Sequence, residues 1–138
     1  MSFHPYLFFS DGACADAFTR YQEIFGGELM VMTNADAPEA DRMPGAEPHH
    51  VMHASIEIGG CHLMGSDDPT GDGGPKSGVA VAFTAADTAQ GGRVFAALSD
   101  GGEVQMPFGP TFWSPGFGSC LDRWGVSWMV DTTPEGEG

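Results

Sequence analysis

The feature that most constrains the fold of this chain is an internal repeat. When the sequence is shifted by 75 positions, the apolar segment 4–9 falls on the apolar segment 79–84, because 4 + 75 = 79. The same shift places the Gly-Gly-Glu motif at 26–28 on the one at 101–103. One register that holds over a strand, a helix and a turn indicates two copies of a single supersecondary unit.

Hydrophobic periodicity predicts the elements of both copies. The first copy is expected to contain a helix and four strands, at 12–25 and at 4–9, 28–32, 51–58 and 61–64. The second copy is expected to contain a helix at 86–99, with strands at 79–84, 103–106 and 126–130. The helix at 86–99 contains Gly91-Gly92, which costs about 1 kcal/mol per glycine relative to alanine.

The order of elements predicts an α+β fold built from paired βαβββ modules. In such a module one face of the sheet lies under the helix and the other face is bare. Two modules side by side would curve their bare faces into a shared trough that suits a ligand. We expect a single domain over 1–138 in four parts: a first repeat at about 3–66, a loop linker at about 67–76, a second repeat at about 77–131, and a tail at 132–138.

Composition excludes several classes of partner. The formal net charge of −14 repels phosphate backbones and acidic membrane surfaces, so neither nucleic acid nor a membrane is an expected partner. No apolar run reaches the roughly 18 residues that a membrane span needs, and the first residues do not resemble a secretory signal. Three widely spaced cysteines favour free thiols in a reducing cytoplasm.

An aromatic segment at 111–118 follows the second copy's helix and the strand after it. Phe112, Trp113 and Phe117 lie there among glycine and proline. Burying such a side chain is worth roughly 1.5–3 kcal/mol, so the segment should cover a core, line a pocket or meet a partner. Stacking on a flat or cationic ligand is one interpretation, and packing at a dimer interface is the other.

Strand alternation places His4, Tyr6 and Phe8 on one face of the first sheet, and Leu7 and Phe9 on the other. The first face is either the ligand-binding face or a part of the core. Six methionines are expected in an adaptable apolar interior that suits varied ligands: Met30, Met32, Met52, Met64, Met106 and Met129.

Several segments in this order resemble one family. They are Pro5-Tyr6-Leu7-Phe8-Phe9, Phe25-Gly26-Gly27-Glu28, the stretch 52–60, Leu63-Met64-Gly65-Ser66-Asp67, Met106-Pro107, Thr111-Phe112-Trp113 and Phe117-Gly118. The chain thereby resembles the PhnB-like group, also called demethylubiquinone-methyltransferase-like. That group belongs to the vicinal-oxygen-chelate superfamily, with glyoxalase I, bleomycin-resistance proteins and the dihydroxybiphenyl dioxygenases. The resemblance implies their fold, a ligand cavity and a homodimer.

Enzymes of that superfamily hold a divalent metal with one side chain from each of four strands. The resemblance carries these four positions onto His4, Met64, Val79 and Met129. Only His4 is a good ligand for zinc, nickel or iron, because a thioether is a poor ligand for such ions and valine is none. We therefore expect no metal cofactor at the standard four-ligand site.

The histidines leave an alternative open. His53 and His4 are the candidate catalytic residues, since imidazole is an effective base near neutral pH. A rearranged zinc, nickel or iron site composed of His4, His53 and Asp67 is the metal-dependent alternative. The other possibility is that these histidines are only hydrogen-bonded strand residues.

Three hypotheses follow. The first is a cytoplasmic, homodimeric PhnB-like protein that binds a small aromatic or cationic molecule through Tyr6, Phe8, Met64, Phe112, Trp113, Phe117 and Met129. The second is a metal-dependent lyase, isomerase or dioxygenase. The third is a structural or regulatory dimer that uses the aromatic segment as its interface. Methyl transfer is not expected, because the sequence lacks a glycine-rich nucleotide loop that joins a strand to a helix.

Overall fold

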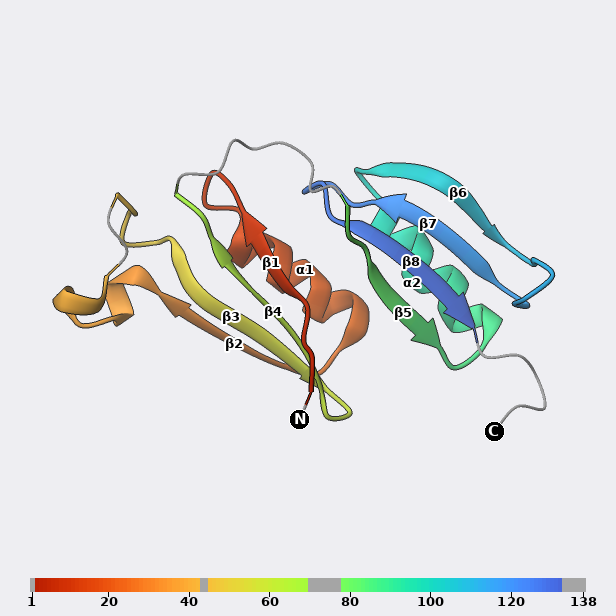
Figure 1. The fold of residues 1–138 in the computed structure, drawn as a ribbon, viewed down its shortest axis with the longest axis horizontal. Helices are drawn as coiled ribbons and strands as arrows, with labels where there is room; N and C mark the ends of the chain where they lie inside the picture. Colours follow the sequence, from red (N-terminus) through yellow and green to blue (C-terminus); the bar gives the residue numbers. More distant parts are fainter. Residues whose placement is uncertain (1, 43–44, 70–77, 133–138) are drawn as a thin grey trace. The chain divides into compact units, whose positions relative to one another are not determined.

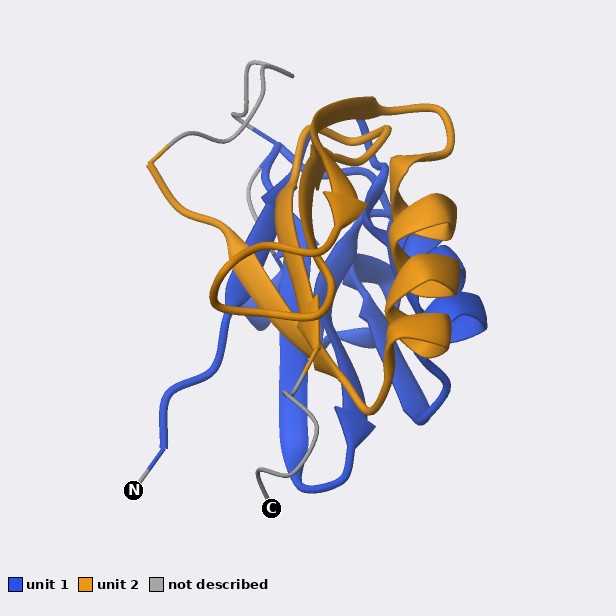
Figure 2. Ribbon diagram, turned by 90° about the vertical axis from the view of Figure 1, so that its right-hand side faces the viewer, with its two compact units in different colours: residues 1–74 blue, residues 75–138 orange. Residues whose placement is uncertain are grey.

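The computed structural model describes residues 2–42, 45–69 and 78–132. The chain forms two compact units, Met1–Gly74 and Pro75–Gly138 (Figure 2). Each unit contains one α-helix and one four-stranded sheet (Figure 1). The α+β class with two four-stranded sheets is thereby confirmed. Most of the linker predicted at 67–76 lies outside the described residues.

The first unit has the order β-α-β-β-β, with two short 3₁₀ turns before its third strand. Its α-helix is α1 (Cys14–Phe25), its 3₁₀ turns are η1 (Asn34–Asp36) and η2 (Glu39–Asp41), and its strands are β1 (Tyr6–Phe9), β2 (Glu28–Thr33), β3 (Val51–Ile58) and β4 (Cys61–Asp67). The strand order in the sheet is β1-β4-β3-β2, and only β1 and β4 run parallel. The two 3₁₀ turns lie between β2 and β3.

The second unit repeats the order β-α-β-β-β. Its helix is α2 (Thr88–Ser99), and its strands are β5 (Val81–Ala85), β6 (Glu103–Gly109), β7 (Phe117–Leu121) and β8 (Ser127–Thr132). The strand order is β5-β8-β7-β6, which is the same topology. Strand β7 was not predicted as a separate element. It begins inside the aromatic segment, so Phe117 is a strand residue.

A single helix covers one face of each sheet. In the first unit, α1 packs on β3, β2 and β4, and in the second α2 packs on β7, β8, β5 and β6. Alternation along β1 follows from this packing, since Leu7 and Phe9 are buried whereas Tyr6 and Phe8 are exposed. No helix in the part of the chain that the structure describes is long and apolar enough to cross a membrane.

Helix α2 forms in spite of Gly91-Gly92. A Cβ atom at Gly91 would lie 2.8 Å from the ring of Phe108, so the glycine allows this ring to pack against the helix. Phe108 also stacks on Phe95, with ring centroids 5.8 Å apart. The tertiary contact therefore compensates for the low helix propensity of this position.

Strand pairing corrects the register of the repeat by one residue. Met64 on β4 lies opposite Tyr6 on β1, and Met129 on β8 lies opposite Ala82 on β5. The Met64–Met129 equivalence predicted from the sequence agrees with this pairing. Tyr6 therefore corresponds to Ala82, an offset of 82 − 6 = 76. The counterpart of His4 is thus residue 80, an alanine, and Val79 was the wrong position.

Two glycines allow the strand after each helix to approach its neighbour closely. A Cβ atom at Gly27 would collide with the carbonyl oxygen of Glu57 on β3, and one at Gly102 would collide with that of Leu121 on β7. The repeated Gly-Gly-Glu motif thus has the same backbone function in both units.

Asp67 joins three elements of the first unit. Its carboxylate is buried and accepts hydrogen bonds from Cys14 N at 2.9 Å and Val51 N at 2.7 Å. The N-cap residue of α1, Ala13, provides no side-chain cap. The carboxylate of Asp67, distant in the sequence, therefore accepts a hydrogen bond from a backbone N–H group at the start of the helix.

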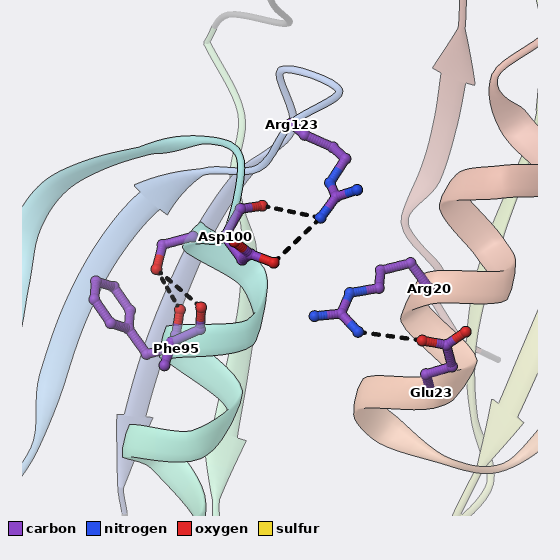
Figure 3. A network of polar contacts seen from close by, with 7 residues as sticks. Arg20, Glu23, Phe95, Asp100 and Arg123 are labelled. Atoms are coloured by element: carbon purple, nitrogen blue, oxygen red, sulfur yellow. Dashed lines mark hydrogen bonds and ion pairs between the residues drawn. The ribbon is translucent and has the colours of Figure 1, made fainter.

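In the second unit, Asp122 and Asp100 organise the turns that connect the elements. Asp122 Oδ1 accepts hydrogen bonds from Trp124 N and Val126 N, and its Oδ2 accepts one from Trp128 Nε1 at 2.9 Å. Arg123 donates to the carbonyl and the carboxylate of Asp100, the residue that follows α2 (Figure 3). These bonds link the hairpin between β7 and β8 to the end of the helix.

We expect Asp67→Ala to destabilise the protein strongly. Hydrogen bonds to charged groups are worth about 1.5–3 kcal/mol each, so losing two should lower the free energy of unfolding by about 3 kcal/mol or more. Chemical denaturation followed by circular dichroism measures this change. Glu39→Ala, which removes an exposed carboxylate, should change stability by no more than about 0.5 kcal/mol. Equal effects of the two variants would contradict the capping role.

Candidate functional site

The sheet faces that the helices leave uncovered hold the candidate site residues. We call the face of the first sheet away from α1 the first open face; its residues are Tyr6, Phe8, Glu28, Met30, Met32, His53, Ser55, Glu57, His62, Met64 and Ser66. The face of the second sheet away from α2 is the second open face; its residues are Ala82, Thr84, Met106, Phe117, Ser119, Met129 and Asp131.

A hydrogen bond joins two polar rings on the first open face. Tyr6 Oη lies 3.1 Å from His53 Nδ1, and the two rings stack with centroids 5.7 Å apart. Tyr6 comes from β1 and His53 from β3, so the pair spans the intervening strand β4. The phenol donates when the imidazole proton is on Nε2 and accepts when it is on Nδ1. Such a pair is able to give or take a proton from a bound molecule.

Apolar groups surround this pair. The ring of Phe8 lies 5.2 Å from that of Tyr6, and 55% of the surface of Phe8 is exposed. Met32 lies opposite His53 on β2 and is also exposed. A ligand on this face would therefore meet aromatic and thioether groups around two polar ring atoms.

A row of matching side chains crosses each open face. In the first sheet, Met64 lies opposite Ser55, and Ser55 lies opposite Met30. In the second sheet, the corresponding row is Met129, Ser119 and Met106. Met30, Met106 and Met129 are exposed, as is Met32. The expectation of a methionine-rich interior was therefore wrong for these four residues, because they lie on the faces that no helix covers.

His4 lies before β1 and contacts a second histidine. Its ring packs edge-on against that of His62, with centroids 5.1 Å apart, and its Nε2 lies 2.9 Å from Ser2 Oγ. His62 and Glu57 are opposite each other on β4 and β3. His4 and His53, the two candidate catalytic residues, thus have different partners.

The aromatic segment before β7 is fixed by a buried hydroxyl. Ser114 Oγ donates to the carbonyl of Gly116 at 2.7 Å and contacts that of Thr132, at the end of β8, at 3.1 Å. The segment holds Trp113 against Phe117, with ring centroids 5.4 Å apart. Phe112 packs edge-on against Trp113 and is almost fully exposed. The three aromatic residues singled out from the sequence therefore form one cluster.

Asp131 is a residue of the second open face that the sequence analysis missed. It lies opposite Phe117 on β7 and opposite Thr84 on β5. Its Oδ1 atom is shielded from solvent and has no hydrogen-bond partner within the described ranges. Nothing in the sequence distinguishes this aspartate from any other near a strand end, since its unpaired state depends on its neighbours in space.

Three of the four positions that the resemblance assigns to the superfamily's metal hold residues that are poor ligands for a divalent ion. His4 is an appropriate ligand, but Met64 and Met129 present thioethers, and the fourth position is an alanine. The alternative ligand Asp67 belongs to the helix-covered face and is engaged by Cys14 and Val51, whereas His53 is on the open face. Within the described ranges, no group of three His, Cys, Asp or Glu residues is arranged to hold a metal ion.

Two of the three cysteines are unsuited to nucleophilic chemistry. Burial, and secondarily the charge of Asp67, raises the pKa of the Cys14 thiol far above its ordinary value. Burial raises the pKa of Cys120 to about 11, with a further contribution from Asp122. Both groups are therefore neutral thiols near pH 8, and the thiolate is the reactive form.

Known proteins with this architecture define its class. A glyoxalase/bleomycin resistance protein/dioxygenase family enzyme from Burkholderia phytofirmans has a TM-score of 0.61 at 12% identity, and the alignment covers 94% of this chain and 97% of that one. At this identity the similarity shows the fold alone. The fold is that of the glyoxalase, bleomycin-resistance and dioxygenase proteins.

Closer relatives define the family. The family model for 3-demethylubiquinone-9 3-methyltransferase matches residues 1–131. Protein YjdN of Escherichia coli is 30% identical over 144 residues, which cover 98% of this chain and 97% of YjdN. Protein PA1353 from Pseudomonas aeruginosa is 39% identical with a TM-score of 0.86, covering 96% of this chain and 97% of that one. The PhnB protein from Bacillus cereus is 23% identical with a TM-score of 0.77, covering 96% and 100%.

The chain therefore belongs to the 3-demethylubiquinone-9 3-methyltransferase-like family, the PhnB-like group. The resemblance found in the sequence is confirmed.

We expect one thiol to react in the native protein. Cys61 is exposed, whereas Cys14 and Cys120 are buried and have raised pKa values. At pH 8 a chromogenic disulfide reagent should label one thiol per chain rapidly, and three after denaturation. Cys61→Ser should abolish the rapid phase. Rapid labelling of two or three thiols in the native protein would contradict the burial of Cys14 and Cys120.

Proposed function

We propose that this chain is a cytoplasmic PhnB-like protein that binds a small aromatic or cationic molecule on its open sheet faces, without the standard four-ligand metal site. The observation that carries the proposal is the collection of exposed aromatic and thioether side chains on those faces. Large apolar groups in water are unfavourable, and contiguous exposed patches commonly mark binding surfaces. The three free cysteines favour a reducing compartment.

The side chains of the faces support an aromatic or cationic ligand. Tyr6 and Phe8 in the first unit, and Trp113 in the second, offer ring surfaces for stacking and for cation–π contact. Methionine thioethers adapt to varied shapes. A net charge of −14 favours the approach of cations over that of anions.

We do not propose methyl transfer, although relatives carry that name. Binding of a nucleotide-derived methyl donor commonly uses a glycine-rich connection between a strand and a helix. In this chain the connections from a strand to the following helix are residues 10–13 and 86–87. The first contains a single glycine and the second contains none.

The second candidate function is a lyase or isomerase that moves a proton on the bound molecule. The hydrogen bond between Tyr6 and His53 favours it, because the phenol would hold the imidazole in one orientation. A metal-dependent form of this enzyme would need ligands besides His4 and His53. Asp67, the third residue proposed from the sequence, already accepts two backbone hydrogen bonds.

We also propose that the active form is a homodimer. The exposure of Phe112 and Trp113 supports an interface at the aromatic segment as an alternative to a ligand contact there. The two roles predict different effects of removing the Trp113 side chain. Only an interface role predicts that its loss changes the mass of the protein in solution.

We expect protein purified without chelator to contain far less than one equivalent of zinc, nickel or iron. The reason is the poor donor set at Met64 and Met129. Elemental analysis of the wild type and of His4→Ala measures the content. Stoichiometric metal that His4→Ala removes would refute the metal-free proposal and favour the metal-dependent enzyme.

We expect Phe8→Ala to weaken the binding of a ligand found by a thermal-shift screen of aromatic and cationic metabolites. Loss of one aromatic contact should reduce affinity roughly tenfold or more, because covering such a side chain is worth about 1.5–3 kcal/mol. The melting temperature of the free protein should change little, since Phe8 is half exposed. Isothermal titration calorimetry measures the affinity.

Phe3→Ala is the matched control for Phe8→Ala. Phe3 is 98% exposed and lies outside the strands, so its loss should leave affinity unchanged.

Trp113→Ala separates an interface role of the aromatic segment from a ligand contact there, when its mass in solution is measured by light scattering and its affinity by calorimetry. A dimer that dissociates would support an interface role, whereas weaker binding by an intact dimer would support ligand contact. Unchanged affinity in both Phe8→Ala and Trp113→Ala would contradict binding on the open faces.

A further inference from the structure

The carboxylate of Asp131 is an unusual feature of the second unit. Its Oδ1 atom is inaccessible to solvent and accepts no hydrogen bond from the residues that the structure describes. Buried polar atoms are nearly always paired, because an unpaired one loses its hydration without compensation. The arginine of the neighbouring hairpin, Arg123, bonds to Asp100 and so does not compensate for it. Asp131 as a whole is only half-buried and its side chain is held by no hydrogen bond among the described residues, so a rotation of the carboxylate would let a ligand N–H supply the missing partner.

Aromatic rings stand beside this carboxylate. Phe117 is the direct cross-strand neighbour of Asp131, and Trp113 packs edge-on against Phe117 at 5.4 Å. Directly opposed residues on one sheet face have Cβ atoms about 4.5–5.5 Å apart. Because half of the Trp113 surface is exposed, one edge of this cluster is available to another molecule.

The same hydrogen bonds fix the backbone that carries the rings and the carboxylate. Ser114 links the aromatic segment to the carbonyl of Thr132, the residue that follows Asp131. Thr132 Oγ1 in turn donates to the carbonyl of Gly116, which precedes Phe117. Both hydroxyl groups are buried, so the arrangement is held before any ligand binds.

From this arrangement we infer that Asp131, Phe117 and Trp113 form a site for a protonated primary amine that carries an aromatic group. The ammonium group donates a hydrogen bond to Asp131 and balances its charge, while the aromatic group lies against Phe117 and Trp113. A quaternary ammonium ion lacks the N–H donor that Oδ1 requires. This inference rests on the proposed function and gives its ligand class.

The probes are benzylammonium, 2-phenylethylammonium and 3-phenylpropylammonium, which vary the distance between ring and charge. Each is titrated into the full chain by calorimetry, beside the alcohol of the same length. At least one ammonium should bind about tenfold or more tightly than its alcohol, since hydrogen bonds to charged groups exceed neutral ones. Asp131→Asn should remove this preference and leave the affinity for the alcohol unchanged.

Glu103→Gln is the matched control, because it removes one carboxylate from an exposed position of the same unit. It should retain the preference for the ammonium. The melting temperature of free Asp131→Asn should equal or exceed that of the wild type, because the substitution removes the charge from a carboxylate with one shielded, unpaired oxygen. A lower melting temperature would mean that the carboxylate stabilises the fold, which would overturn the inference.

Three results on binding would also overturn it. They are equal affinity for ammonium and alcohol, an ammonium preference that survives in Asp131→Asn, and no binding by any of the three ammonium probes. The proposed function would stand in each case if a compound from the thermal-shift screen bound in a manner that Phe8→Ala weakens. The two proposals thus fail separately.

Discussion

The structure depends on the fact that a single twelve-residue helix packs on each four-stranded sheet. Strand side chains alternate between two faces, so one helix buries one set and leaves the other without cover. In the first unit this separates Phe9, which is buried beneath α1, from its neighbour Phe8, which is half exposed. The aromatic, thioether and polar groups of the candidate site lie on the sheet faces that the helices do not cover.

The topology of the units follows from patterns that the sequence displays. Alternation along 4–9 predicted which side chains of β1 would share a face, and the Gly-Gly-Glu motifs marked the ends of both helices. The exact alignment of the two units was harder to predict from the sequence, because small differences in the lengths of their elements and loops cancel along the chain. The offset between the units is 76 at Tyr6 and Ala82, 74 at the starts of the two helices, and 75 at the glycines. A comparison without gaps finds their mean and misplaces the strand by one residue.

The site was predictable only where it depends on strand alternation. Tyr6, Phe8 and Met64 lie on one face because of their positions in β1 and β4. The role of Asp67 was not apparent, since its partners Cys14 and Val51 are 53 and 16 residues away in the sequence. The unpaired state of Asp131 was equally hidden. It reflects the absence of a donor among groups that come together only in the folded chain.

The close approach at Gly27 and Gly102 bears on how the two halves have come to differ. At each position the carbonyl oxygen of the neighbouring strand occupies the space that any side chain would need. A side chain at either position would therefore push the paired strands apart. The two halves agree at these backbone contacts, whereas most of the other positions that the repeat aligns differ. The short motif shared by the halves thus records a mechanical requirement of the architecture as much as common descent.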